Sequence, residues 1–166
     1  LKNFPKNLEK CIIRPATVCG LSPAMRFDVS VNILTNYACN KKYIKVFGGK
    51  QIRPNIHIDD MVNVYRHFLS AKSTESGCYN AGFENISILD IAKLVTKKIN
   101  AEIIITESND PRSYRQDSSK LLNTGFKPQY TVNKAIEDVI EAYKLNKIKD
   151  SEKSYTVKWM KKLGLN

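Results

Sequence analysis

Hydrophobic and polar positions follow two different periods along this chain, and the periods alternate. A repeat of two, as in residues 43–47, predicts a half-buried strand. Apolar residues spaced by three and four, as in residues 88–99, predict an amphipathic helix with one buried face. We expect strands over residues 10–15, 43–47, 55–58, 78–82 and 103–105, and helices over residues 27–40, 61–72 and 88–99 and from a cap at Thr131 through Tyr143.

Residues that can accept hydrogen bonds stand before the predicted helices. Ser87 precedes one of them and the pair Asp59-Asp60 precedes another, so we expect these side chains to cap the free backbone N–H groups of the first turn. The end of the chain is less regular. Residues 144–154 are polar and charged, which predicts a frayed segment, and residues 157–163 predict one amphipathic turn.

The alternation of strands and helices indicates an α/β protein, and the composition is that of a globular domain. The chain has 166 residues, of which 42% are hydrophobic and 26% charged, and no apolar run approaches the roughly 20 residues that cross a bilayer. These values exclude disordered, collagenous and membrane-spanning classes. We therefore expect a cytoplasmic protein. Its cysteines show neither a C-x-x-C pair nor ligand spacing to histidine, which predicts buried free thiols and no metal site; they are Cys11, Cys19, Cys39 and Cys78.

The chain is basic, with 27 Lys and Arg against 16 Asp and Glu and a net charge of +11. Such a balance suits an anionic partner, whether a nucleic acid, a membrane surface or a phosphorylated substrate. However, 21 of the 27 basic residues are Lys and they are scattered, whereas readers of phosphates and bases favour Arg. Two explanations of the basic charge therefore stay open: a bias in amino-acid composition, and a preference for anionic ligands.

The seven glycines exclude a familiar type of cofactor loop. A doubly wound dinucleotide domain opens with a strand, a glycine-rich turn and a helix. The glycines of this chain form neither that fingerprint nor a P-loop, although Gly48-Gly49 predicts a tight turn after residues 43–47. The chain therefore has no cofactor fingerprint, and its pattern indicates a small α/β unit and not a complete nucleotide-binding fold.

Two segments concentrate residues that can bind a nucleotide. Residues 44–60 carry Phe47 and Arg53 near one loop end, and residues 109–120 offer further Arg and Tyr side chains. An aromatic face beside a guanidinium group can hold a base and a phosphate. Each residue also has a structural alternative, because Phe47 can belong to the core and Arg53 can pair with the nearby aspartates.

These segments belong to a longer series of motifs that resembles a known family. Together the motifs resemble the C-terminal half of the extended short-chain dehydrogenase/reductase family, the NAD-dependent nucleotide-sugar epimerases and dehydratases. The match runs from about Cys11 to Tyr143. In order, the motifs are Arg14-Pro-Ala-Thr-Val-Cys-Gly20, Val46-Phe-Gly-Gly49, Arg53-Pro-Asn-Ile-His-Ile-Asp-Asp60, Tyr79-Asn-Ala-Gly82 and Arg112-Ser-Tyr-Arg-Gln-Asp-Ser-Ser-Lys120.

The resemblance implies a fold and places several residues beside the cofactor and the sugar. The implied fold is the C-terminal part of a Rossmann-type extended SDR fold, with the last strands of the sheet and a small α/β substrate-binding domain. Pro15 and Ala16 are implied to lie beside the nicotinamide of NAD by their backbones. Thr17 stands where many relatives have an Asn that touches the substrate, and Asn32 lies in the helix that supplies a further substrate contact.

The resemblance also implies a site for the nucleotide diphosphate. Phe47 falls on the position that packs against the base, and Arg53 falls on a diphosphate-binding position. Arg112 and Tyr114 match a second clamp on the phosphate and nucleoside. Three further matched positions are implied to be structural and to act at a helix start: His57, Asp59 and Asp60.

The catalytic pair of the family is not found at its place in this chain. Relatives use a Tyr-x-x-x-Lys pair shortly before the Arg-Pro strand, with the Tyr as acid/base and NAD as hydride acceptor. Only thirteen residues precede Arg14 here, and none is Tyr. Three such strings occur downstream of that strand, and we interpret them as chance matches: Tyr37/Lys41, Tyr130/Lys134 and Tyr143/Lys147.

The sequence therefore predicts part of an enzyme that is inactive alone. Residues 1–20 would end the cofactor-binding domain, residues 21–147 would bind the nucleotide sugar, and residues 148–166 would form a tail. We expect the complete enzyme to bind NAD and an NDP-sugar, to dimerise through the half that is missing here, and to bind neither nucleic acid nor membrane. Two alternatives stay open, namely a non-catalytic nucleotide-binding module (or one chain of a split enzyme) and a basic nucleic-acid-binding domain.

Overall fold

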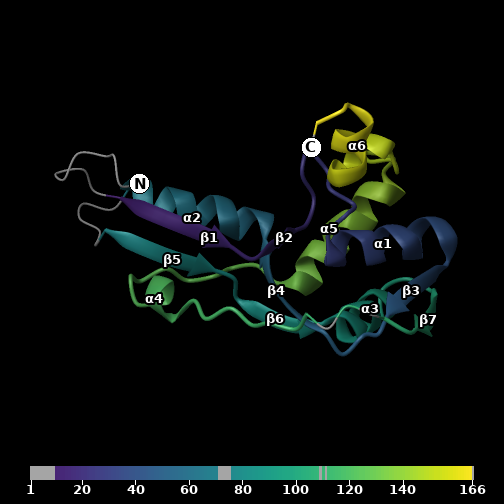
Figure 1. The fold of residues 1–166 in the computed structure, drawn as a ribbon, viewed down its shortest axis with the longest axis horizontal. Coiled ribbons are helices and arrows are strands. Elements are labelled where there is room, and N and C mark those ends of the chain that lie inside the picture. Colours follow the sequence, from purple (N-terminus) through teal and green to yellow (C-terminus); the bar gives the residue numbers. More distant parts are fainter. Residues whose placement is uncertain (1–9, 71–75, 109, 111, 166) are drawn as a thin grey trace.

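The computed structural model describes residues 10–70, 76–108, 110 and 112–165, and it shows an elongated α/β molecule with two lobes (Figure 1). Parallel strands combined with helices confirm the predicted fold class. The strands are β1 (Cys11–Pro15), β2 (Thr17–Cys19), β3 (Tyr43–Phe47), β4 (Ile52–His57), β5 (Gly77–Ala81), β6 (Glu84–Ser87) and β7 (Glu102–Thr106). The helices are α1 (Ser30–Lys41), α2 (Ile58–Ser70), α3 (Ile88–Thr96), α4 (Ser119–Leu122), α5 (Val132–Lys144) and α6 (Thr156–Lys162), with a 3-10 turn, η1, at Glu152–Ser154.

The strands form three small sheets along the long axis. In the small lobe β1 pairs in parallel with β5 and places Ile12 opposite Cys78. In the large lobe β3 pairs in parallel with β7. Between the lobes β4 lies in the middle of a three-stranded sheet, parallel to β2 and antiparallel to β6. Helices α2 and α4 belong to the small lobe, and α1, α3 and α5 belong to the large lobe (Figure 1).

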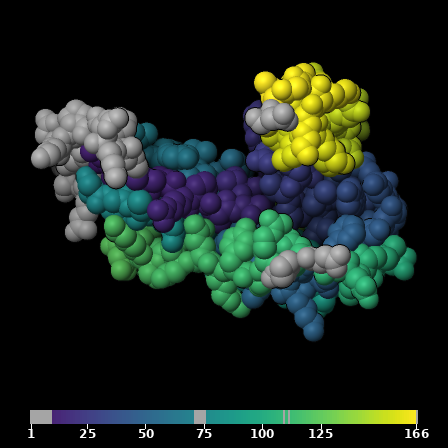
Figure 2. Space-filling view, viewed as in Figure 1, coloured from purple at the N-terminus to yellow at the C-terminus, as the bar shows by residue number. Residues whose placement is uncertain are grey.

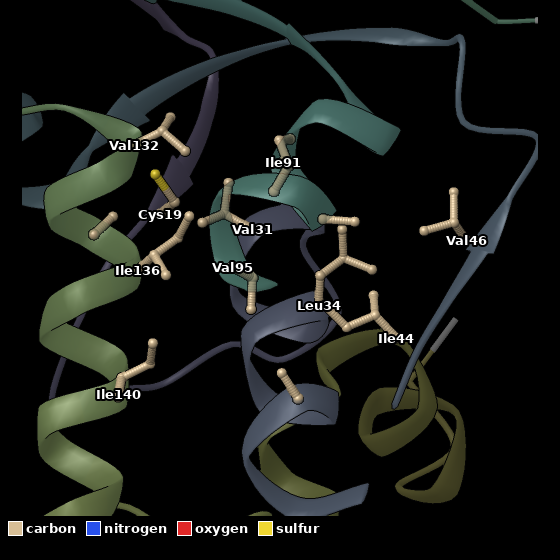
Figure 3. Packing of buried hydrophobic residues seen from close by; sticks show 13 residues of the cluster. Cys19, Val31, Leu34, Ile44, Val46, Ile91, Val95, Val132, Ile136 and Ile140 are labelled. Atoms are coloured by element: carbon tan, nitrogen blue, oxygen red, sulfur yellow. The ribbon is translucent and has the colours of Figure 1, made fainter. Parts of the chain in front are cut away.

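Each lobe has its own hydrophobic cluster. The large-lobe cluster lies where α1, α3 and α5 meet β3 (Figure 3). Its buried members are Cys19, Val31, Leu34, Ala38, Ile44, Val46, Ile91, Ala92, Val95, Val132, Ala135, Ile136 and Ile140. The small-lobe cluster has fewer buried members, which are Ile56, Met61, Val64, Tyr79, Ala81, Leu121 and Phe126. Burial of these side chains is the main source of stability in both lobes.

Helix α1 begins three residues later than the pattern predicts. Phe27 is fully buried, with its ring centroid 6.1 Å from that of Tyr143 and 6.4 Å from that of Tyr155. Its backbone N–H donates to the carbonyl of Ser154 at 2.7 Å. Since this residue is held by a distant segment, the helix starts only at Ser30. The short strands β2 and β6 were not predicted, because three or four residues do not show a period.

The start of helix α2 corrects one prediction. The helix begins at Ile58, and its first turn is capped by His57, whose Nδ1 accepts the backbone N–H of Asp59 at 3.1 Å. Asp60 is fully buried and does not cap the helix. Its carboxylate accepts the backbone N–H groups of Gln129 and Tyr130 at 2.9–3.1 Å, and it thereby ties α2 to the segment before α5. Residues 71–72 of the predicted helix lie outside the described residues.

The polar C-terminal segment is bound to the large lobe and not frayed as predicted. Asn36 of α1 donates to the Asp150 carboxylate at 3.0 Å and to the Tyr155 hydroxyl at 3.2 Å, and it accepts a hydrogen bond from the Tyr143 hydroxyl. Figure 2 shows this segment standing above the rest of the large lobe. Helix α6 matches the predicted amphipathic turn. Within the described part of the chain, no helix is long and apolar enough to cross a membrane.

Candidate functional site

Two adjoining grooves bring together most of the residues that the sequence singles out. The first, which we call the β3 groove, has a volume of about 560 Å³ and lies among α1, the end of β3 and the residues Glu107, Ser108 and Asp110. The second, the β2 groove, has a volume of about 590 Å³ and lies at the junction of β1 and β2. Arg53 lines the β3 groove and the next residue, Pro54, lines the β2 groove, so the two grooves adjoin.

Phe47 presents its ring to the β3 groove. It is the last residue of β3, and the strand alternates so that Ile44 and Val46 are buried while Phe47 is 53% exposed. The two-glycine turn that follows adopts positive φ at Gly48 (72°) and Gly49 (101°), a backbone conformation that favours glycine. The structure therefore excludes the alternative in which Phe47 is a core residue.

Arg53 also lines the β3 groove and is held in place by several contacts. Its side chain is only 14% exposed, and its Nη2 atom lies 3.2 Å from the carboxylate of Asp110. Its Nη1 atom donates to the carbonyls of Ile52 and Arg112, and the guanidinium carbon lies 5.1 Å from the centre of the Tyr114 ring. The alternative ion pair with the aspartates of α2 does not form.

Asp110 joins the two arginines of the predicted diphosphate site. Arg112, whose side chain is 77% exposed, donates its Nε and Nη2 to the same carboxylate at 2.7 and 2.8 Å. These hydrogen bonds and the charge of Arg112 hold the pKa of Asp110 well below its usual range. One carboxylate thus faces two guanidinium groups, so this cluster of three side chains carries a net positive charge.

Pro15, Ala16 and Thr17 line the β2 groove, opposite Tyr114 and its neighbours. The backbone here is fixed on two sides. Ala16 donates its N–H to the carbonyl of Ala81 at 2.8 Å, and Gln116 donates its side-chain amide to the carbonyl of Arg14 at 2.9 Å.

Gly82 permits this close approach of three segments. A Cβ atom at this position would lie 2.4 Å from Oε1 of Gln116 and 2.5 Å from Cβ of Ala16, distances that atoms in contact do not reach. Steric exclusion of a side chain therefore explains why the Tyr79-Asn-Ala-Gly82 motif ends in glycine. It lets residues 114–116 approach the end of β1 and form one wall of the β2 groove.

Asn32 does not join the other predicted residues. It is 3% exposed, and its Oδ1 accepts the N–H of Gly20 at 3.0 Å while its Nδ2 donates to the carbonyl of Arg26 at 3.0 Å. These bonds hold the loop between β2 and α1. The side chain of Asn32 is thus bound to backbone groups of the protein, and the substrate contact that the sequence predicts for it stays a prediction.

The three Tyr-x-x-x-Lys strings have structural partners. Lys41 lies 4.3 Å from the centre of the Tyr37 ring on α1. Tyr130 stacks on His57 at 4.9 Å between ring centroids, and Tyr143 donates to Asn36.

Sequence reasoning missed two polar residues of the grooves. It named the loop of Asp110 without giving that residue a role, and it gave none to Ser30. Ser30 lines the β3 groove, and its Oγ is buried without a hydrogen-bond partner among the described residues. The described residues contain no group of three or more His, Cys, Asp or Glu side chains that could hold a metal ion.

Comparisons with known proteins place this geometry in context. No protein-family model matches the chain. Anthocyanidin reductase of Arabidopsis thaliana is 26% identical over 142 residues, which cover 78% of this chain and 40% of that protein. UDP-glucuronic acid 4-epimerase of Bacillus cereus, solved in complex with UDP-glucuronic acid and NAD, is 26% identical with a TM-score of 0.72; the match covers 87% of this chain and 48% of the epimerase.

A third protein shares the fold at lower identity. dTDP-glucose 4,6-dehydratase of Bacillus anthracis, solved in complex with NAD, is 18% identical with a TM-score of 0.67, over 89% of this chain and 47% of the dehydratase. The chain thus spans about half the length of the proteins it matches or less.

Proposed function

We propose that the chain is the nucleotide-sugar-binding half of an NAD-dependent epimerase or dehydratase of the extended short-chain dehydrogenase/reductase family, which its similarity to such enzymes supports. Residues 1–20 would complete the cofactor domain, residues 21–147 would bind the substrate and residues 148–166 would pack as a tail. The UDP-sugar in the Bacillus cereus epimerase supports a UDP-sugar as the first ligand to test.

The observation that carries this proposal is the order of groups along the two grooves. A half-exposed aromatic ring, Phe47, stands at one side of the β3 groove. The guanidinium groups of Arg53 and Arg112 come next, joined by Asp110. Pro15 and Thr17 line the adjoining β2 groove. This is the order of base, diphosphate and sugar in an NDP-sugar.

Each group supplies a specific part of the binding. The ring of Phe47 can stack on a base, which contributes on the order of 1–3 kcal/mol. The planar forks of the two arginines match phosphate oxygens and form charge-assisted hydrogen bonds. A bound diphosphate would share the guanidinium groups with Asp110 or replace its carboxylate, so part of the favourable interaction offsets the loss of those ion pairs.

The chain offers NAD one wall only. Pro15 and Ala16 lie at the edge of the β2 groove with their backbone fixed by β5, which fits a flat contact with a nicotinamide ring. NAD, when bound, would take a hydride from the sugar. In our proposal the rest of the NAD site, the Tyr-Lys pair and the dimer contacts belong to the other half of the enzyme, while this chain orients the sugar toward them.

Calorimetric titration of the chain with UDP, dTDP, GDP and CDP tests the proposal. We expect at least one nucleotide to bind with a micromolar Kd. Arg53→Ala should weaken binding by about 10- to 100-fold, since a hydrogen bond to a charged group contributes about 1.5–3 kcal/mol. Phe47→Ala should weaken it by about tenfold.

Two controls protect this test. Arg66→Ala removes the same charge from an exposed position of α2 and should leave the Kd unchanged. Arg53→Lys keeps the charge but not the fork and should recover part of the affinity. Absence of binding to all four nucleotides, or equal affinity in Arg53→Ala and Arg66→Ala, would contradict the proposal.

The intact mass of the native protein separates the enzyme from the alternative of a stand-alone binding module. A mass near twice 18.9 kDa supports a complete enzyme with a cofactor half on the same polypeptide. A native product of 18.9 kDa would favour a split enzyme or a non-catalytic module, and an activity assay after addition of the partner chain would distinguish those two.

A further inference from the structure

The β2 groove contains an arginine that the proposed function does not use. Arg115 lines this groove and is exposed, and it forms no ion pair or hydrogen bond with any described residue. The other arginine of the groove, Arg26, is already neutralised, because its Nε and Nη2 bind the carboxylate of Asp28 at 3.0 and 3.2 Å. Among the described residues that line the β2 groove there is no Asp or Glu.

The charge of the β3 groove is different. Its lining includes two cations, Lys45 and Arg53, and three carboxylates, those of Asp28, Glu107 and Asp110. Arg53 there already has a partner of opposite charge in Asp110, so the phosphate of a ligand would exchange with that carboxylate. The β2 groove instead holds a guanidinium group with no counter-charge in its lining.

The path of the chain orders these charges along the ligand. Residues 112–118 lead from the large lobe back to α4 in the small lobe (Figure 1). Arg112 pairs with Asp110, which lines the β3 groove. Arg115, three residues later, lines the β2 groove together with Pro15, Ala16 and Thr17. A diphosphate on Arg53 and Arg112 would place the sugar next to Arg115.

We propose that Arg115 makes the β2 groove selective for a nucleotide sugar whose hexose carries a carboxylate. The inference rests on the proposed function, since it needs the nucleotide to occupy the β3 groove. A guanidinium fork matches a carboxylate with two parallel hydrogen bonds, and this geometry gives specificity as well as affinity. A neutral sugar in the same position would form no ion pair with Arg115, whose guanidinium group would then be hydrated by solvent.

Titration of the 166-residue chain with UDP, UDP-glucose and UDP-glucuronic acid at low salt tests this inference. All three share the nucleotide; UDP lacks the hexose, and the two sugar nucleotides differ only in the group at C6 of the hexose. We expect UDP-glucuronic acid to bind about tenfold more tightly than UDP-glucose. Arg115→Ala should reduce this preference to less than about twofold while the Kd of UDP-glucose stays the same. Arg115→Lys should retain part of the preference because it keeps the charge.

Further readouts identify the group on which Arg115 acts. The preference should shrink in 0.5 M salt, because the pair is exposed. Arg66→Ala, the matched loss of charge on α2, should keep the full preference. Equal weakening of UDP and UDP-glucuronic acid in Arg115→Ala would place Arg115 on the diphosphate and overturn the inference.

The remaining outcomes separate this inference from the proposed function. If the wild-type chain binds UDP-glucose and UDP-glucuronic acid equally, and Arg53→Ala weakens both, the selectivity is wrong and the proposed function stands. If neither UDP nor either sugar nucleotide binds, and no other nucleotide replaces them, the proposed function fails and this inference fails with it.

Discussion

The large and small lobes bury their apolar side chains to different degrees. The large-lobe cluster gathers side chains from three helices, β2 and β3, and it closes around Ile44, Val46 and Ile136 with no exposure at any of them. The small-lobe cluster is smaller, and its helix α2 leaves Tyr65 and Leu69 50% and 86% exposed. Among the described strands, β1 pairs only with β5 and has one unpaired edge.

This difference bears on how each groove is supported. The β3 groove stands on the lobe with the larger and more enclosed core, so the positions of Phe47 and Arg53 depend on contacts within the chain. Part of the β2 groove stands on β1, beside an open strand edge and exposed apolar residues of the kind that another element usually covers. The nucleotide end of the proposed site is therefore more self-supporting than the sugar and cofactor end.

A matched pair of core truncations tests whether the lobes differ in packing. Ile136→Ala in the large lobe and Leu121→Ala in the small lobe each remove a fully buried aliphatic side chain. We expect Ile136→Ala to lower the free energy of unfolding by about 2–5 kcal/mol, because closely packed neighbours cannot move in to fill the cavity that the substitution leaves. Leu121→Ala should cost about half as much, since a smaller cluster can relax around the gap.

Urea unfolding, followed by circular dichroism and by the fluorescence of Trp159, measures both values. Trp159 belongs to α6 beside the large lobe, so its signal reports that lobe, while circular dichroism reports both. Coincident transitions would show one cooperative unit. A cost of Leu121→Ala equal to or above that of Ile136→Ala would contradict the difference in packing.

A smaller effect is expected from the thiol at the edge of the large-lobe cluster. Burial, with a further contribution from the charge of Glu84, raises the pKa of Cys19 from 9.0 to about 12. Since the folded pKa is raised, the stabilisation is complete below pH 9 and is lost as the pH rises from 9 toward 12. We expect unfolding free energy to fall by about 2 kcal/mol between pH 9 and 10.5 from this group.

The slope of stability with pH is the readout for this prediction. Cys19→Ala creates a small cavity at every pH but removes the titrating thiol, so its free energy of unfolding should decline less steeply above pH 9 than that of the wild type. Cys78→Ala, at a partly buried position of the small lobe, is the control. Equal slopes in all three proteins would show that Cys19 does not titrate in this range.

Strong local patterns account for the parts of the fold that the sequence predicts. Strand β3 alternates cleanly over residues 43–47, and α3 begins right after Ser87, whose hydroxyl accepts the N–H of Asp90 at 3.1 Å. Helix α5 begins after Thr131 in the same way. Long-range contacts decide the rest. Asp60 binds the segment before α5, and Phe27 binds the C-terminal segment. A local sequence pattern cannot predict either of these contacts.

The candidate site also combines features that the sequence motifs indicate with contacts that they could not predict. Phe47 and Arg53 line one groove, and Tyr114 lies against the guanidinium group of Arg53; their roles in binding a nucleotide stay a prediction. The motifs could not show that Asp110 bridges both arginines, since Asp110 and Arg53 are 57 positions apart in the sequence. They also could not show that the side-chain amide of Asn32 is bound by the backbone.

The smallest expected effect concerns Asp110. Its carboxylate binds Arg53 and Arg112, and a diphosphate must compete with it for both. Asp110→Asn keeps the shape and removes the charge, so we expect UDP to bind about threefold more tightly, close to 0.7 kcal/mol. Asp117→Asn is the matched control, because Asp117 lies in the same loop and accepts the N–H of Ser119 at 2.9 Å without touching an arginine.

Salt dependence separates competition by Asp110 from a role in holding the loop. If the carboxylate competes with the ligand, the affinity gained in Asp110→Asn shrinks as salt screens the charges. Weaker binding by Asp110→Asn at every salt concentration would show that Asp110 mainly positions the two guanidinium groups. In that case the carboxylate of Asp110 holds the guanidinium groups of Arg53 and Arg112 in the orientation that binds the ligand. The β3 groove would then contain an acidic residue, which the described lining of the β2 groove lacks, because the two arginines need it for their position.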